Sequence, residues 1–174
     1  MRFLVSAALL LPLACIVPAP GGQGGKSQMS APPLVLGNGA VFGDRVEVVR
    51  AVVRPGRATV GEAVTIALIM RVLAPFDDDY DIFVHIEDAD GRAERRNSDH
   101  APLRGTRPTR SWRAGETLTD EFVLDVPNGV QRAVSVWFGF WQPRRDVRVP
   151  LSNPERVRHD GQDRVWLGQI PVGR

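Results

Sequence analysis

The residues with the clearest chemical potential stand together at Ser98-Asp99-His100. A serine, a carboxylate and a histidine make up the hydrolase triad, in which the histidine removes the proton of the serine nucleophile. Neighbouring side chains in an extended chain point to opposite sides, so three consecutive residues rarely converge. The chain also has no Gly-x-Ser-x-Gly turn that would present a nucleophile. We therefore predict that the protein is not an enzyme and uses no cofactor.

A metal or acid–base site is the other use open to the histidines. His85, His100 and His159 could combine with Asp99 for this purpose, since imidazole and carboxylate are common ligands and proton carriers. Their separations match no pair of ligands on one helix. His85 alternates with apolar neighbours, so we expect a structural histidine that is hydrogen-bonded.

Four aspartates gather just before a predicted strand, at Asp77, Asp78, Asp79 and Asp81. Carboxylate oxygens at this density can hold Ca²⁺. Aspartate is also a common turn residue, because its side chain bonds to the backbone two residues on. We expect a turn here, with calcium as the weaker alternative.

Four tryptophans could form a surface for sugars. In the segment 134–141, period-two alternation puts Trp137 and Trp141 on one face, and Trp166 belongs to a later segment of the same kind. Exposed indoles would stack on the apolar face of a sugar ring. The alternative, which we favour, is that both strand faces are covered and that Trp112 closes one end of the core.

The elements that must position these residues are strands. Past residue 40 no segment keeps a helical period over ten residues, whereas period-two alternation recurs between clusters of Gly, Pro, Asn and Asp. The predicted strands are 46–52, 64–72, 82–86, 118–126, 133–141 and 164–172, with a further strand after a tight hairpin turn at 88–91. About seven short strands at this spacing predict an all-β fold, an antiparallel immunoglobulin-like sandwich. The polar segment 98–113 is expected to cross the end of this sandwich.

Several strings in the second half of the chain resemble one particular β-sandwich module. They are Phe83-Val84-His85-Ile86, Asp88 to Arg92, Asp99 to Thr109, Trp112 to Glu116, Gly139 to Pro143 and Asp163 to Gly168. The module is that of the soluble C-terminal tails of bacterial polytopic glycosyltransferases of the dolichyl-phosphate-mannose type, and of stand-alone envelope proteins. The resemblance covers 80–174 and, more faintly, 44–79. It implies a non-catalytic immunoglobulin-like domain and carries no active-site residue onto this chain.

Two positions depart from that module. The family often has Tyr where Arg107 stands, and a Gly-Tyr-Thr start where this chain has Gln131-Arg132-Ala133. The membrane-embedded part of the glycosyltransferases has no counterpart here.

The charge pattern argues against nucleic acid as a partner. Lys26 is the only lysine among 22 basic residues, and these are interleaved with 20 acidic ones for a net charge of +2. Arginine pairs such as Arg95-Arg96 and Arg144-Arg145 form no basic stripe of the kind that nucleic acids require.

The N-terminus predicts export. Met1-Arg2 is followed by an apolar stretch to Leu13 that is too short to span a bilayer. Ala14-Cys15 resembles the end of a bacterial lipobox, where the cysteine receives lipid, although Pro12 departs from the usual pattern. Ordinary secretion with cleavage near 19–21 is the alternative.

The predicted organisation follows from these observations. We expect a signal peptide at 1–14, a flexible Pro- and Gly-rich tether at 15–40 that starts at lipidated Cys15, and a β-sandwich at 41–174. The expected role is an exported, membrane-anchored envelope protein with a binding or structural sandwich. The alternative is a carbohydrate-recognition module, and the partners are an envelope glycan or protein.

Overall fold

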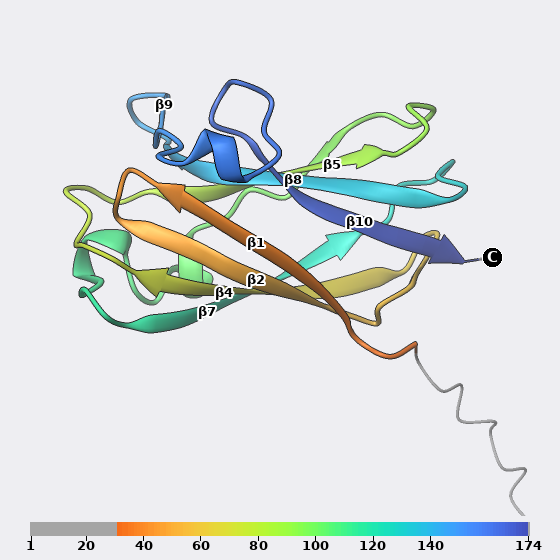
Figure 1. Cartoon of the computed structure of the whole chain (residues 1–174). Coiled ribbons are helices and arrows are strands. Elements are labelled where there is room, and N and C mark those ends of the chain that lie inside the picture. The colour runs from red at the N-terminus through yellow and green to blue at the C-terminus, as the bar shows by residue number, and fades with distance from the viewer. Residues whose placement is uncertain (1–30, 174) are drawn as a thin grey trace, which may run out of the picture.

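The computed structural model describes residues 31–173, which form two β-sheets packed face to face (Figure 1). One sheet has the order β1-β2-β4-β7, and the other has the order β3-β10-β8-β5-β6 with β9 paired to β8. The prediction of an all-β sandwich is confirmed. The strands are β1 Leu34–Phe42, β2 Val46–Arg54, β3 Ala58–Thr59, β4 Ala63–Val72, β5 Asp81–Asp88, β6 Arg96–Asn97, β7 Thr117–Asp125, β8 Ala133–Gln142, β9 Val147–Arg148 and β10 Val165–Gly173.

Three short 3₁₀ helices complete the described part of the chain: η1 Pro102–Gly105, η2 Thr109–Ser111 and η3 Pro154–Arg156. No helix within residues 31–173 has the length and apolar character that a bilayer crossing needs. The predicted signal peptide, Cys15 and most of the predicted tether lie outside the described residues.

The domain begins earlier than residue 41. Strand β1 contains residues 34–40, which the composition assigned to the tether, and it pairs with β2 from Leu34↔Val53 to Phe42↔Val46. The start of β1 is not visible in the composition, because two glycines and an asparagine interrupt the strand and make it resemble the Pro- and Gly-rich stretch before it.

Strand β1 also closes one side of the sandwich. Leu36 packs on Gly168 of β10 so closely that a Cβ there would come within 2.7 Å of a leucine methyl group. The Asn38 side-chain amide donates a hydrogen bond to the Trp166 carbonyl at 3.2 Å. These contacts join the edge of one sheet to a strand of the other.

The core lies between the two sheets and follows the predicted alternation. On β8, Val134, Val136, Phe138 and Phe140 are fully buried. Phe42 of β1 meets the rings of Phe138 and Phe140 edge to face, with centroids 5.6 and 5.2 Å apart. Buried side chains of this size contribute roughly 1.5–3 kcal/mol each, so the alternating strands supply most of the driving force for folding.

The turn after β5 is not the tight hairpin that the sequence predicts. Gly91 does form a turn with Asp88, but the chain returns to pair with β5 only at β6, Arg96–Asn97. The Asp88 carboxylate accepts hydrogen bonds from the backbone N–H groups of Asp90, Arg92 and Ala93. Burial alone raises the pKa of Asp88, but these three bonds outweigh it and hold the pKa below its usual value. The carboxylate therefore stabilises a wider loop.

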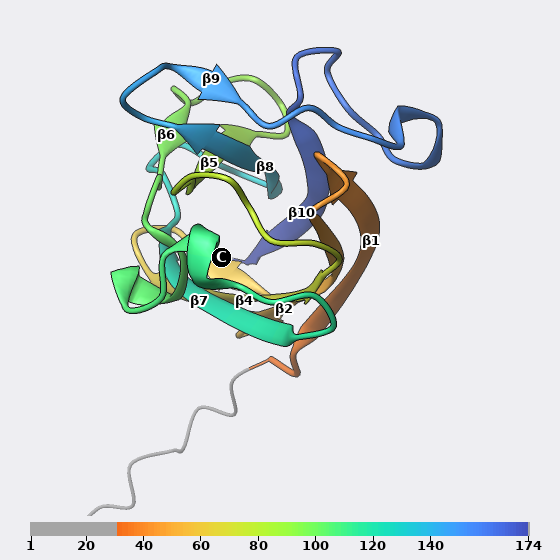
Figure 2. The ribbon, with the colours of Figure 1, turned by 90° about the vertical axis from the view of Figure 1, so that its left-hand side faces the viewer.

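The polar segment from Ser98 to Arg113 runs along the open side and the end of the sandwich, as expected (Figure 2). Trp112 is 1% exposed and belongs to the core, where its ring meets that of Phe76 edge to face at 5.8 Å. Its Nε1 donates to the Arg107 carbonyl at 3.2 Å. Trp112 therefore holds the segment against the core, as the sequence predicts.

Candidate functional site

Half-buried His100 and fully buried Asp120 form a pair on the open side of the sandwich. His100 Nε2 lies 2.8 Å from Asp120 Oδ2, and its Nδ1 lies 2.9 Å from the Ser98 carbonyl. Both partners can only accept, so both ring nitrogens carry protons and the ring is an imidazolium. Burial by itself lowers the pKa of His100, but the bonds to Asp120 and Ser98 raise it above its usual value.

The three residues of the triad pattern do not converge. The Ser98 hydroxyl donates to the Val123 carbonyl at 3.2 Å, and Asp99 Oδ1 accepts from the backbone N–H of Val84 at 2.9 Å. His100 has no free lone pair with which to remove a proton. In this arrangement the three side chains hold the segment 98–100 in place between β5 and β7.

The row of large side chains on the outer face of the six-stranded sheet comes from three strands. Trp166 of β10 faces Trp137 of β8, which in turn faces His85 of β5. The segment between β8 and β10 covers this row. Arg164 lies 4.7 Å from the Trp137 ring centroid, and Arg158 lies 4.8 Å from that of Trp166.

The tryptophans therefore do not form an open stacking surface. Trp137 is 9% exposed, Trp112 is in the core, and guanidinium groups stack on Trp137 and Trp166. Trp141 is half-buried, and no arginine within residues 31–173 stacks on it. The alternative in which both faces of β8 are covered describes the structure better than the sugar-stacking one.

Arg164 is the centre of the covering segment. Its guanidinium donates to Glu87 Oε1 at 2.6 Å and Asp160 Oδ2 at 2.8 Å, and it lies 3.3 Å from His85 Nδ1. One planar group thus joins β5, β8 and the loop before β10, a geometry that suits the fixed fork of arginine.

The aspartates before β5 are used in separate local contacts. Asp78 Oδ2 accepts from Arg145 and Gln142, Asp79 pairs with Arg110, and Asp77 accepts from the Tyr80 hydroxyl. Asp81 is half-buried, and burial raises its pKa. Within residues 31–173 no three His, Cys, Asp or Glu side chains are placed to hold one metal ion.

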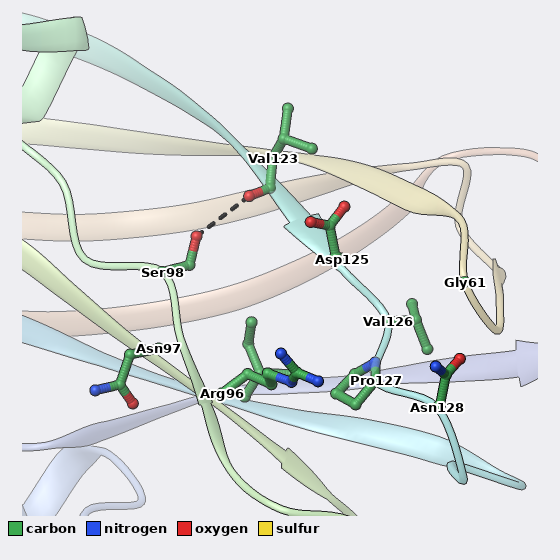
Figure 3. A pocket seen from close by; sticks show the side chains of 10 residues that line it. Gly61, Arg96, Asn97, Ser98, Val123, Asp125, Val126, Pro127 and Asn128 are labelled. Carbon is green, nitrogen blue, oxygen red and sulfur yellow. Dashed lines mark hydrogen bonds between the residues drawn. The ribbon is translucent and has the colours of Figure 1, made fainter.

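A pocket of about 320 Å³ opens where the two sheets diverge, between β6 and the end of β7; we call it the lateral cleft (Figure 3). Figure 3 shows Ser98 pointing across it to the Val123 carbonyl, while the Arg96 side chain reaches toward Pro127. The lateral cleft is lined by Gly61, Ile86, Arg96, Asn97, Ser98, Val123, Asp125, Val126, Pro127 and Asn128.

The lining of the lateral cleft combines polar groups with an apolar floor. Ile86 and Val126 are 2% and 3% exposed, whereas Arg96, Asp125 and Asn128 are exposed at the rim. Only Arg96 stands out among these rim residues in the sequence, as one of an arginine pair and not as part of a site, since no motif connects β6 to the end of β7. The Pro127-Asn128-Gly129 turn after the strand was the only local signal.

The edge of β7 beside the lateral cleft has free backbone groups. Val126 and Glu116 at its two ends bond to the β4 side, so residues 117, 119, 121, 123 and 125 turn their N–H and C=O groups outward. Among the described residues these groups have no backbone partner, and Ser98 is bonded to one of them.

Comparison with known proteins adds little to this geometry. No protein-family model matches the chain, and no curated protein is significantly similar to it. Among solved structures, the crystal structure of the C-terminal domain of Wzt aligns with 18% identity and a TM-score of 0.44, over 82% of this chain and 79% of that one. A likeness at this level carries no argument about function. The resemblance to glycosyltransferase tails stays a prediction from the motifs.

Proposed function

We propose that the protein is a non-catalytic binding module and that its ligand occupies the lateral cleft. One observation carries the proposal: a pocket of about 320 Å³ lies on the open side of the sandwich, with an apolar floor and a polar rim. This volume falls within the range of roughly 300–1,000 Å³ typical of small-molecule sites.

Binding without chemistry is supported by the state of the nearby reactive groups. His100 has both ring nitrogens engaged, and the Ser98 hydroxyl bonds to a backbone carbonyl rather than to a base. A nucleophile needs an adjacent base to become reactive, and neither group has that relation to the other.

The polar rim favours an uncharged ligand with many hydrogen-bonding groups. Arg96 and Asp125 bring one charge of each sign, and Asn97 and Asn128 each offer a donor and an acceptor. A saccharide of one or two rings presents hydroxyl groups of both kinds and an apolar ring face that suits the floor at Ile86. An envelope glycan is therefore the ligand class that we propose.

Titration of the protein with neutral oligosaccharides, followed by calorimetry, tests this function. Arg96→Ala and Asp125→Ala should each weaken binding by about tenfold, because each removes a hydrogen bond that involves a charged group. Arg50→Ala is the matched control, since Arg50 is an exposed arginine on β2 of the other sheet. Equal affinity in all three variants, or no binding of any neutral glycan, would refute the proposal.

We also propose that the module is exported and anchored to a membrane through lipid on Cys15. The support is the sequence alone: a basic start, an apolar stretch and Ala14-Cys15. Cys15→Ser should release the protein from the membrane fraction into the soluble one. If fractionation of the expressed full chain does not change, the anchor is not at Cys15.

A further inference from the structure

His85 is buried, yet it keeps one hydrogen-bonding group unused. It is 7% exposed, and its Nδ1 faces the Arg164 guanidinium at 3.3 Å. Arginine can only donate, so Nδ1 must accept and the proton of the neutral ring must sit on Nε2. Among the described residues, Nε2 has no hydrogen-bond partner. The Nε2–H group reaches the surface and is not sealed in the core, so it is free to donate to a molecule bound beside the ring.

A small pocket of about 120 Å³ lies beside this ring on the outer face of the six-stranded sheet; we call it the His85 pocket. Its lining is Phe83, His85, Asp99, Trp141, Asp146 and Arg148. Arg148 covers the Phe83 ring at 4.8 Å. Asp99 Oδ1 accepts a hydrogen bond from the Val84 backbone N–H, so Asp99 Oδ2 remains free to accept another. Within residues 31–173 the Asp146 carboxylate makes no hydrogen bond.

The groups of the His85 pocket exclude three ligand classes. A metal would need a lone pair on Nε2, but the Arg164 contact places the proton there. An ammonium group would meet the Nε2–H donor. An anion would meet the carboxylates of Asp99 and Asp146, and the cation in the lining, Arg148, is already stacked on Phe83 and bonded to the Gln162 carbonyl. A neutral hydroxyl group both accepts from nitrogen and donates to a carboxylate, so it satisfies both sides of the pocket.

We propose that the His85 pocket binds the vicinal diol of a neutral sugar or polyol, with one hydroxyl accepting from His85 Nε2 and the next donating to Asp99. Its volume admits the edge of one ring or a glycerol unit, and the half-buried Trp141 lies where it can contact the carbon skeleton. The site lies on the outer face of β5 and is independent of the lateral cleft.

Nuclear magnetic resonance on the full chain tests the site directly. Two probes carry a vicinal diol: methyl α-mannopyranoside represents a sugar ring, and glycerol represents a lipid headgroup. The third probe, cyclohexanol, has a single hydroxyl and is the negative control. Either diol should shift the His85 Nε2–H signal saturably, while cyclohexanol should not. An equal response to cyclohexanol, no response to both diols, or a response only to inorganic phosphate would overturn the proposal.

Binding by variants, followed at the Trp141 indole signal, tests the separate roles of His85 and Asp99. His85→Gln keeps an N–H donor at similar reach and should bind within about threefold of the native chain, whereas His85→Phe should weaken binding by about tenfold. Asp99→Asn retains the bond to Val84 but loses the free acceptor, and it should also weaken binding about tenfold. Arg50→Ala, at an exposed position on β2 of the other sheet, is the control and should leave the response unchanged. Native-like binding by both His85→Phe and Asp99→Asn would place the diol elsewhere.

Discussion

At the scale of single residues, buried His85 and half-buried His100 respond to their surroundings in opposite ways. The His100 pKa is raised by its bonds to Asp120 and Ser98, which outweigh burial. The His85 pKa is lowered, first by burial and then by the positive charges of Arg95 and Arg164. The folded chain therefore protonates His100 more readily than His85.

These opposite shifts predict a stability maximum near the ordinary histidine pKa of about 6.5. The contribution of His100 is complete below this pH and is lost as pH rises through its raised folded pKa. The contribution of His85 has the reverse sign: below about pH 6.5 the unfolded chain takes up a proton that the folded chain does not, so stability falls. Urea unfolding between pH 5.5 and 8.5 measures the free energy of unfolding on both sides of this maximum.

His100→Asn should abolish the fall in stability above the maximum and leave the fall below it unchanged. It should also lower the free energy of unfolding by about 3–5 kcal/mol, because it leaves the Asp120 carboxylate, which is 0% exposed, without its charged partner. His159→Asn is the control, since His159 is exposed. An unchanged profile in His100→Asn would mean that the ion pair does not control the pH dependence.

At the scale of elements, Arg164 is the residue that fastens the segment between β8 and β10 to the outer face of the six-stranded sheet. Arg164 joins Glu87, Asp160 and His85 and stacks on Trp137. Its side chain is 16% exposed, so its partners lie in a partly desolvated setting where the loss of one charge matters.

Arg164→Ala should destabilise the fold by about 3–5 kcal/mol, because it leaves the Glu87 carboxylate and His85 Nδ1 without a partner and removes the charged partner of Asp160. Arg164→Lys should recover only part of this loss, since a compact ammonium cannot bond to three groups and stack on an indole. Urea unfolding followed by tryptophan fluorescence measures both, with Arg50→Ala as the control. Equal stability of the lysine variant and the native chain would show that only the charge matters.

How far the sequence predicts the structure also differs from element to element. Alternation in β8 correctly assigns Val134, Val136, Phe138 and Phe140 to the core, because burial of one face is a local property of a strand. The covering of Trp137 and Trp166 depends on arginines in a separate segment, which no local period reveals. The lateral cleft depends on how far β6 and β7 diverge, and the sequence has no measure of that distance.

At the scale of the whole molecule, strand β1 decides where the domain starts. A chain that begins at residue 41 would lose the pairing of Leu34 to Gly37 with β2 and the packing of Leu36 on Gly168 of β10. The exposed side of the sandwich would then include both an unpaired strand edge and part of the core.

We therefore expect residues 31–174 to unfold cooperatively and residues 41–174 to be less stable by several kcal/mol, because the shorter chain leaves the Leu36 site empty. Thermal unfolding of the two chains compares them directly. Leu36→Ala in the longer chain separates the lost packing from the lost strand pairing. Identical melting temperatures for the two chains would mean that β1 contributes nothing to the domain.

The hydrogen bond from Ser98 to the Val123 carbonyl opposes association between molecules at high protein concentration. It engages one of the outward backbone groups of β7 at the point where a strand from another molecule would begin to pair. Nearby, Arg104 and Glu121 place opposite charges along the same edge. A sheet that ends in nine extended residues thus keeps a barrier to edge-to-edge assembly, and that barrier rests on Ser98 and Arg104 of the neighbouring segment as well as on Glu121 of the strand.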